Sequence, residues 1–353
     1  MTPPVTLCIV NYNGERYLPR TLEAVRGSSL EFDEILLVDD ASPDRSVALV
    51  RESWPEVTVL ARAKNGGPGA ARNAGYAAAR NDLILFIDND VALTPECAGR
   101  LRTALLEREG AAVAMPRVLY AARPDTIQYE GADCHFLGLM ALRRVDQPAA
   151  EAPAGVEETQ SVVTCGFLVH RGRRGTSPPF DESFIFNYED HDFGVRTRIM
   201  GHIVLAVGDA LVLHGEGTAG LSFRQGRERS PIRVYCLIRN RWRILLQSFQ
   251  LRSLVLLTPC LAVYEIVQLG GVVKKGWLGP WLRAVGWILT NPGTILERRR
   301  AVQHDRRTPD RAVLVGGPLP FTPGFAPSGF ERLARGALDR FAARYWRMVR
   351  GRL

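Results

Sequence analysis

Two aspartates separated by one residue follow a short apolar run, and they are well placed to bind a divalent cation. Residues 83–87 are too few for a helix and are typical of a buried parallel strand, and Asp88 and Asp90 come where this run stops. On an extended backbone, residues two apart point to the same side, so both carboxylates can face one Mg²⁺ or Mn²⁺ ion. A solvated turn would place the same two residues there, and the rest of the sequence must decide.

Polar residues also follow three other strand-like runs, at residues 5–10, 34–38 and 57–60. Apolar residues at helical spacing separate these runs, which predicts a Rossmann-like, mostly parallel, doubly wound α/β sheet. The carboxyl ends of parallel strands meet along one edge, so the residues that follow them should line one crevice. These residues are Asn11, Asn13, Asp39, Asp40, Asn65, Asp88 and Asp90.

A glycine-rich segment at residues 64–69 precedes an alanine-rich helix, and its composition suits a diphosphate. Glycines let a backbone approach a ligand closely, a helix start has unpaired N–H groups, and Arg72 adds a cation. The sequence has no P-loop pattern, so this segment differs from the phosphate-binding loop of P-loop NTPases. It also has no G-x-G-x-x-G after the first strand, which argues against a dinucleotide-dependent dehydrogenase.

A second acidic group opens the helix that ends at Gly201. It consists of Glu189, Asp190 and Asp192. Carboxylates at a helix N-terminus commonly just cap the helix and match its dipole, so the residues alone leave a catalytic role open.

Length and composition suit a folded chain with one large domain and an appendage, or with two modest domains: it has 353 residues, of which 46% are hydrophobic. The six cysteines include no C-x-x-C pair, so we expect reduced core thiols and no zinc site. The N-terminus lacks the pattern of a signal peptide, which leads us to expect a cytoplasmic catalytic part.

The net charge of +8 is unevenly distributed along the chain. From Arg224 onward there are 24 basic and 7 acidic residues, a balance of +17, and the preceding part has 21 and 30, a balance of −9. The basic residues are mixed with apolar residues and with tryptophan and tyrosine. This mixture favours an anionic membrane surface over nucleic acid, with an ordinary basic helical surface as the alternative.

The basic part is expected to be helical. After Ser230 an apolar face of six residues is surrounded by Arg233, Arg239, Arg241 and Arg243, as in a basic amphipathic helix; the apolar residues are Ile232, Tyr235, Ile238, Trp242, Leu245 and Phe249. Further helices are expected at residues 277–290 and 330–350, with a Pro/Gly linker at 316–329 between them.

Residues 253–273 are apolar for long enough to span a bilayer. Pro259, Glu265 and positive charge on both flanks disfavour a single crossing. We therefore favour an in-plane or re-entrant anchor; a span, a hairpin and a soluble helical subdomain remain alternatives.

These patterns predict three regions. A catalytic domain is expected at residues 1–225, with a nucleotide-binding half at about 1–115 and an acceptor half at about 116–225, in which residues 117–158 look irregular. Membrane-associated helices follow at 226–310, and a linker and basic helix at 311–353.

Six segments in order resemble the family 2 glycosyltransferases of the GT-A fold, bacterial rhamnosyltransferase-like members in particular. The resemblance covers about residues 5–217. The segments are V-N-Y-N-G at 10–14, V-D-D-A-S-P-D at 38–44, N-G-G-P-G-A-A-R-N-A-G at 65–75, D-N-D at 88–90, E-D-H-D at 189–192 and L-H-G at 213–215. Each segment alone is a weak signal, and the six together are a strong one.

The resemblance implies a role for each residue of the crevice. Asp39 would bind the base and ribose of a nucleotide in a pocket with Asn11 and Asn13, and Arg72 would act on the diphosphate. Asp88, Asp90 and His214 would hold Mn²⁺ or Mg²⁺, although a lone histidine in a strand is more often structural. Asp190 would be the general base, with Asp192 and Glu189 supporting it or binding the acceptor. The donor-binding set is then Asn11, Asn13, Asp39, Asp40, Asn65, Arg72 and Asp88.

The resemblance also implies the reaction. A metal-dependent, inverting enzyme would transfer a sugar from a UDP- or dTDP-sugar to a glycan or lipid-linked acceptor at the inner face of the cell membrane. A non-catalytic nucleotide-sugar-binding subunit and a nucleotidyltransferase are the alternatives; the latter normally has a glycine-rich first loop with a downstream lysine, which is missing here. A homodimer through the basic helices is a further possibility, and no nucleic-acid partner is expected.

Overall fold

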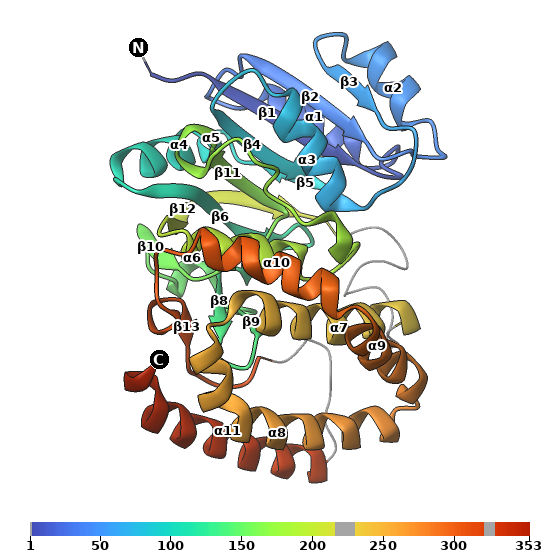
Figure 1. Cartoon of the computed structure of the whole chain (residues 1–353). Coiled ribbons are helices and arrows are strands. Elements are labelled where there is room, and N and C mark those ends of the chain that lie inside the picture. Colours follow the sequence, from blue (N-terminus) through green and yellow to red (C-terminus); the bar gives the residue numbers. More distant parts are fainter. Residues whose placement is uncertain (1, 216–229, 321–328) are drawn as a thin grey trace. The chain divides into compact units, whose positions relative to one another are not determined.

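The computed structural model describes residues 2–215, 230–320 and 329–353 (Figure 1). The chain divides into two units. The first contains Met1–Ala132, Leu142–Thr197 and His202–Gln225, and the second contains Asp133–Ala141, Arg198–Gly201 and Gly226–Leu353. The predicted boundary between residues 225 and 226 lies outside the described residues.

The first unit contains a large sheet whose strand order is β10-β12-β6-β11-β4-β1-β2-β3. The half that begins the chain is parallel and alternates with helices, as predicted. Its elements are β1 (Val5–Asn11), α1 (Leu18–Arg26), β2 (Glu34–Asp39), α2 (Ser46–Ser53), β3 (Thr58–Ala61), α3 (Pro68–Ala78) and β4 (Leu83–Asp88). Asn11 pairs with Asp39, and Val10 pairs with Asp88, so the carboxyl ends of three strands are aligned.

The other half of this sheet is mixed. Strand β11 (Gly166–His170) runs antiparallel between β4 and β6 (Ala111–Tyr120), and β12 (Ile203–His214) runs parallel to β6. The remaining elements are β5 (Val91–Leu93), α4 (Cys97–Glu107), β7 (Arg123–Tyr129), η1 (Ala149–Glu151), β10 (Val156–Thr159), α5 (Arg171–Arg174), η2 (Glu182–Phe184) and α6 (Glu189–Ile199).

One expectation about this half was wrong. Residues 117–158, expected to be irregular, contribute several short strands. Strand β7 starts with exposed residues, so its sequence lacks a regular apolar alternation, and it pairs with β6 through register shifts. Strand β12 also has an irregular register with β6, which shifts between Val207 and Leu211.

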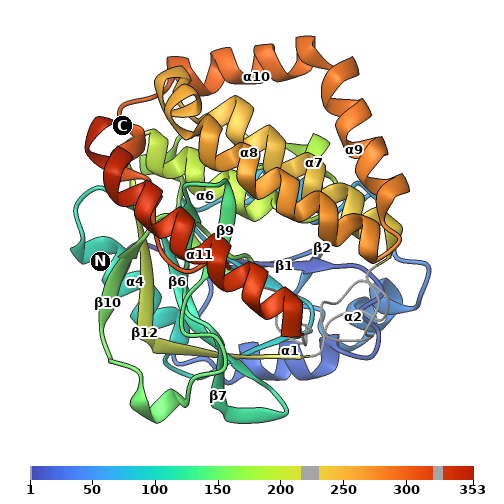
Figure 2. The same cartoon turned by 90° about the horizontal axis from the view of Figure 1, so that it is seen from below.

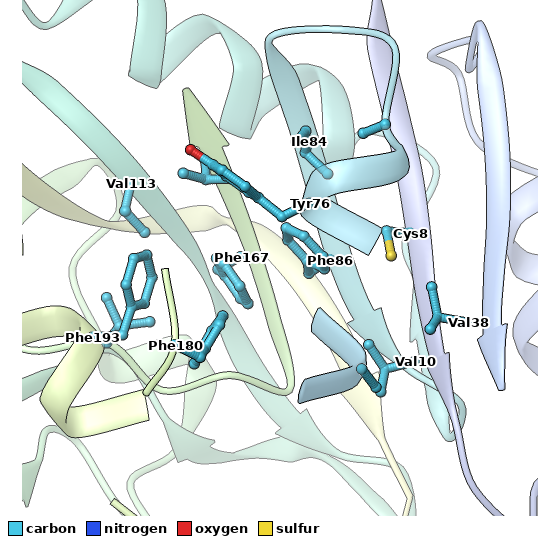
Figure 3. Close-up of a cluster of buried hydrophobic side chains, with 14 of the residues drawn as sticks. Cys8, Val10, Val38, Tyr76, Ile84, Phe86, Val113, Phe167, Phe180 and Phe193 are labelled. Atoms are coloured by element: carbon cyan, nitrogen blue, oxygen red, sulfur yellow. The ribbon is translucent and has the colours of Figure 1, made fainter. Parts of the chain in front are cut away.

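Aromatic side chains from strands and helices form the core of the first unit (Figure 3). Phe86 of β4 stacks on Phe167 of β11 with ring centroids 5.0 Å apart, and Phe180 and Phe193 pack around Phe167. Helix α3 lies close to the sheet at Gly75, where a Cβ atom would come within 2.3 Å of the Cys8 sulfur. All six cysteines are free and buried, which confirms the predicted core thiols.

The second unit consists mainly of helices, and all of those described except α10 lie near positions expected from the sequence. They are α7 (Pro231–Ser248), α8 (Leu251–Lys274), α9 (Leu278–Thr290), α10 (Pro292–His304) and α11 (Gly329–Val349), with short turns η3 (Asp310–Ala312) and η4 (Arg350–Arg352). A small sheet of β13 (Leu314–Val315), β8 (Ala132–His135) and β9 (Leu139–Leu142) accompanies them. Helix α8 packs against α11 (Figure 2).

Helix α7 is not the exposed basic amphipathic helix that its sequence suggested. Its arginines Arg233, Arg239, Arg241 and Arg243 are buried. Aromatic rings lie over three of these guanidinium groups: Arg239 is 5.1 Å from the ring centre of Tyr235, Arg241 is 4.4 Å from that of Tyr264, and Arg243 is 5.3 Å from that of Trp287. Arginine tolerates such a site because its planar group stacks on aromatic faces.

Candidate active site

The predicted site residues converge on the carboxyl edge of the parallel strands in the first unit. Asn11, Asp39 and Asp88 end β1, β2 and β4, which are neighbours in the sheet. Arg72 lies in the first turns of α3, and Glu189 begins α6. Ion pairs connect these helices to each other and to the end of β4, so these predicted residues meet within this unit.

Asn11, Asp39 and Ser42 form a hydrogen-bonded group at the ends of β1 and β2. The amide of Asn11 donates to Asp39 Oδ1 at 2.7 Å, and both the hydroxyl and the backbone N–H of Ser42 donate to the Asp39 carboxylate. The backbone N–H of Asn13, which has a φ of 53°, donates to Ser42 Oγ at 3.0 Å. Ser42 thus holds the loop that presents Asn13, a role that its place in a turn sequence did not indicate.

Asp40 organises the glycine-rich loop. Its carboxylate accepts the backbone N–H groups of Gly66 and Gly67, the latter at 2.8 Å, and also pairs with Arg62. The exposed side chain of Asn65 accepts the same Gly67 N–H at 3.1 Å. Asp40 and Asn65 therefore hold the loop in place. Contacts of these two residues with a nucleotide sugar stay predictions.

Arg72 connects the two acidic groups of the site. This buried guanidinium donates to Asp88 Oδ1 at 2.6 Å and to the carbonyl oxygen of Thr164 at 2.7 Å. Its Nη1 atom lies 3.8 Å from Glu189 Oε1. Burial raises the pKa of Asp88 above its ordinary value, and the Arg72 charge opposes this shift. In this structure Arg72 is thus paired with protein carboxylates.

Asp88, Asp90 and His214 lie together at the predicted cation site. His214 Nε2 is 3.4 Å from Asp90 Oδ1, and the charges of Asp90 and His214 both act on Asp88. The side chain of Asp88 is 31% exposed, so a cation can reach it. Asn89, between the two aspartates, turns inward and donates to Asn11 Oδ1 at 2.7 Å.

The donor chemistry of these three side chains fits Mn²⁺ or Mg²⁺, which take carboxylate oxygens and, for manganese, imidazole nitrogen. They do not form a closed protein cage: within the described ranges, no group of three or more His, Cys, Asp or Glu side chains is arranged to hold a metal ion by itself. Mg²⁺ on a diphosphate typically uses one or two carboxylates, with phosphates and waters as its other ligands. The arrangement suits such a shared ion.

Gln128 is a functional candidate that sequence reasoning missed. It is a buried residue of β7, and its Oε1 lies 2.7 Å from His214 Nδ1. With the amide assigned this way, Nδ1 carries the proton, because a carbonyl oxygen only accepts. Nε2 then directs its lone pair toward the Asp90 carboxylate, and a cation between them would stabilise this arrangement. No motif in residues 117–158 indicated this residue.

Asp190 and Asp192 occupy different environments at the start of α6. Asp192 is buried, and its Oδ2 accepts from Arg196 Nε at 2.7 Å. The carboxylate of Asp190 accepts the backbone N–H of His191 at 2.8 Å from Oδ1, and burial raises the pKa of Asp190. Burial also raises the pKa of Glu189, and the Asp190 charge adds to this shift. Asp190 is therefore better suited to accept a proton than Asp192.

The segment before α6 is held in unusual backbone conformations. Ile185, Asn187 and Tyr188 all have positive φ angles, between 59° and 70°. His191 is fully buried, and its Nδ1 lies 2.6 Å from Ser161 Oγ, while burial lowers its pKa to about 3. A neutral His191 thus fixes the start of α6 to residue 161. Such strain persists where surrounding structure enforces it, as in functional sites.

Residues 6–144 match the family model described as Glycosyl transferase family 2. This part of the chain therefore resembles glycosyltransferase family 2 domains. The succinoglycan biosynthesis protein ExoO of Rhizobium meliloti is 33% identical over 156 residues, which are 44% of this chain and 42% of that protein. The chain spans less than half of the length of the first curated relatives that it matches.

Solved glycosyltransferases of the GT-A fold share this architecture at low sequence identity. TarS 1–349 of S. aureus, in complex with UDP-GlcNAc, has a TM-score of 0.55 and 15% identity, and the match covers 98% of this chain and 92% of that one. GalNAc-T7 with UDP, GalNAc and Mn²⁺ has a TM-score of 0.59 and 15% identity, over 75% of this chain and 51% of that one. The predicted GT-A fold is confirmed.

Proposed function

We propose that this protein is an inverting, metal-dependent glycosyltransferase that uses a UDP- or dTDP-sugar as donor. One observation carries the proposal. Arg72 joins Asp88, at the cation site, to Glu189, the neighbour of Asp190, within a single unit. A cation site and a carboxylate with a raised pKa are thus next to each other, as displacement of a diphosphate by a hydroxyl requires.

The donor would lie along the ends of β1, β2 and β4. Asp39 and Asn11 lie where the base and ribose of a nucleotide would bind, and the N-terminus of α3 offers N–H groups toward phosphates. The structures of TarS with UDP-GlcNAc and of GalNAc-T7 with UDP support a nucleotide-sugar donor on this fold. A deoxyhexose such as rhamnose is the sugar that the sequence resemblance favours.

Asp88, Asp90 and His214 would hold Mn²⁺ or Mg²⁺, and the bound ion would neutralise the charge that develops on the leaving diphosphate. The protein itself contributes Arg72, whose positive charge next to Asp88 limits the repulsion between the site and the phosphates. Gln128 would keep His214 oriented for its role as a ligand.

Asp190 would act as the general base. The acceptor hydroxyl attacks the anomeric carbon, its proton passes to the Asp190 carboxylate, and the bond from that carbon to the diphosphate oxygen breaks as the new glycosidic bond forms. A single displacement with one base inverts the configuration at the carbon. Glu189, adjacent and also buried, would support Asp190 or bind the acceptor, and Asp192 would position α6 through Arg196.

The acceptor would be a glycan or a lipid-linked saccharide in the synthesis of a cell-surface polysaccharide. The relation to the succinoglycan biosynthesis protein ExoO supports this class of product. The proposal places the enzyme at the cytoplasmic face of the cell membrane, where nucleotide sugars and lipid-linked acceptors meet.

A panel of nucleotide sugars, tested for thermal stabilisation with and without Mn²⁺, would examine this function. A cognate donor at about 100 times its Kd should stabilise the protein by about 2.7 kcal/mol. The gain should require metal and should disappear in Asp90→Ala, whose own Tm should stay close to wild type. Stabilisation without hydrolysis or transfer under any condition would instead indicate a non-catalytic binding subunit. No effect of any nucleotide sugar would contradict the proposal.

A further inference from the structure

Helix α8 has one face packed on protein and one exposed apolar face. Ser253, Leu257, Cys260 and Leu261 are buried on the packed side. On the opposite side, six large apolar residues are between 37% and 71% exposed: Leu251, Val255, Val263, Ile266, Val267 and Val273. At 100° per residue these six lie on one side of the helix, so they form a continuous strip along its length.

The exposed strip is bordered by positive charge. Arg252 lies at its start and Lys274 at its end, followed by Lys275. Between residues 231 and 290 the only acidic residue is Glu265, and its carboxylate is paired with Arg241 of α7. Helix α9 has three exposed leucines of its own, Leu278, Leu282 and Leu289.

We propose that this strip of α8 binds the surface of an anionic lipid bilayer. Exposed apolar residues next to arginine and lysine can insert among lipids while the charges meet anionic headgroups. A second copy of the chain fits the strip less well, because a twofold contact would bring Arg252, Lys274 and Lys275 of both copies together. The charge therefore favours lipid as the occupant.

The helix lies in the plane of the membrane surface and does not cross it. By length and composition α8 could span a bilayer, and among the described residues it is the one helix that could. However, Tyr345 of α11 donates to the carbonyl oxygen of Leu256 at 2.6 Å, and Glu265 is tied to α7. A helix with protein along one face and charged ends on both sides can offer only its other face to lipid.

This assignment differs from the one that the sequence suggested. The arginines of α7 were expected to surround the apolar face of a basic amphipathic helix, but Arg233, Arg239, Arg241 and Arg243 are buried. The positive charges that border the strip are instead those of Arg252, Lys274 and Lys275, all of which are at least partly exposed.

The test uses the full-length chain and the double variant Val255→Glu/Ile266→Glu. Both side chains are exposed, so the new charges should not disturb folding. In flotation with vesicles of phosphatidylcholine and phosphatidylglycerol, wild type should bind and the variant should bind at least about tenfold more weakly. Val156→Glu is the matched control, since Val156 is an exposed valine of the first unit, and it should bind like wild type.

A second variant tests the charges. Lys274→Gln/Lys275→Gln should weaken binding to the anionic vesicles by about fivefold per residue and reduce its salt dependence. Binding of either variant to Mn²⁺ and a nucleotide sugar should equal that of wild type, because the site lies in the other unit. A failure of the membrane proposal is thereby distinguished from a failure of the proposed catalytic function.

Three results would overturn the proposal. The first is equal absence of wild-type binding to vesicles with and without phosphatidylglycerol. The second is a dimer of the wild type, seen by sedimentation in the absence of lipid, that the Val255→Glu/Ile266→Glu variant breaks. The third is retention in membranes after alkaline extraction, which would indicate a helix that spans the bilayer.

Discussion

Asp190 and Asp192 show how neighbouring carboxylates in one motif can have different tasks. Both lie in the first turn of α6, and their positions in E-D-H-D do not separate a base from a structural acid. The structure separates them by their partners. Asp192 is neutralised by Arg196, whereas burial disfavours the charged form of Asp190 and raises its pKa.

Asp190→Asn should lower kcat by about 10² or more while donor affinity stays near wild type, because the amide keeps the shape and cannot accept the proton. Asp192→Asn is the control. The free energy of unfolding of Asp192→Asn should be about 1 kcal/mol lower than that of wild type, because its hydrogen bond to Arg196 is weakened. Its kcat should fall by less than tenfold. Steady-state kinetics, donor titration and thermal unfolding would compare them. A larger loss of kcat in Asp192→Asn would move the base to that residue.

The raised pKa of Asp190 also predicts the pH dependence of transfer. The base must be ionised, so kcat/KM should fall as the pH decreases through this raised pKa, at a higher pH than for a carboxyl with its ordinary value. A pH profile measures the inflection, and the residual activity of Asp190→Asn should lack it. An acid limb near pH 4, the ordinary carboxyl range of about 3.9 to 4.3, would argue against a buried base.

Gln128→Leu should weaken Mn²⁺ binding in the presence of UDP by about 10- to 100-fold, since His214 would lose the acceptor that orients its ring. Gln128→Glu keeps an acceptor at the same place and should bind the ion at least as well as wild type. Calorimetric titration of Mn²⁺ measures both. Equal metal affinity in Gln128→Leu and wild type would show that Gln128 only fills space.

At the scale of elements, the glycine-rich loop at residues 64–69 lies in close contact with the segment before α6. Gly67 has a φ of 84°, and a Cβ atom there would lie 2.4 Å from the carbonyl oxygen of Ile185. The loop that would approach the diphosphate therefore touches the strained segment that leads to the proposed base. A side chain at residue 67 would disturb both sides of the reaction centre.

Gly67→Ala should destabilise the protein by about 1–3 kcal/mol and lower both donor affinity and kcat. Gly155→Ala is a suitable control: its φ is 104°, and nothing lies within 4 Å of the added Cβ, so it carries the backbone strain without the clash. Thermal unfolding and kinetics of the two variants separate the effect of backbone strain at a positive φ from that of the steric clash with the Ile185 carbonyl oxygen. Similar kinetics for both would show that the contact at Ile185 has no catalytic consequence.

The sequence predicted elements with strong local signals and missed those that depend on distant partners. The buried run that forms β4 and the alternation of β1 to α3 were recognisable from apolar periodicity, and the residues at the strand ends do converge. Strand β7 was missed because its first residues are exposed and its pairing with β6 is irregular. Gln128 was missed with it, as its role follows from the position of His214, 86 residues away.

At the scale of the whole molecule, the net charge counted from the sequence differs from the charge carried by exposed side chains. The second unit contains most of the basic residues from Arg224 onward, yet Arg233, Arg239, Arg241 and Arg243 are buried. Helical periodicity showed where the apolar residues of α7 lie but could not show that Tyr264 of α8 lies over Arg241 and Trp287 of α9 over Arg243. The surface potential of this unit is therefore set by fewer residues than the count of +17 implies.

The position of β11 between β4 and β6 also makes a prediction for fragments. A chain cut after residue 144 would contain the full family match at residues 6–144 but would lack β11. It would remove both β11 and β12 from β6, and it would leave one edge of β4, which consists almost entirely of buried apolar residues, without a partner. Such an edge promotes aggregation, so this fragment should be insoluble when expressed, whereas a fragment of residues 1–225 should be recovered in soluble form.

The same strand order governs when the first unit can fold during synthesis of the chain. Residues 83–88 leave the ribosome long before residues 166–170, which complete the pairing of β4 and supply the neighbouring carbonyl oxygen of Cys165 to the N–H of Asp88. At about 5–20 residues per second, this delay lasts several seconds. During it the most apolar strand of the nascent chain has an open side, so the slowest and most chaperone-dependent stage of folding should be the insertion of β11.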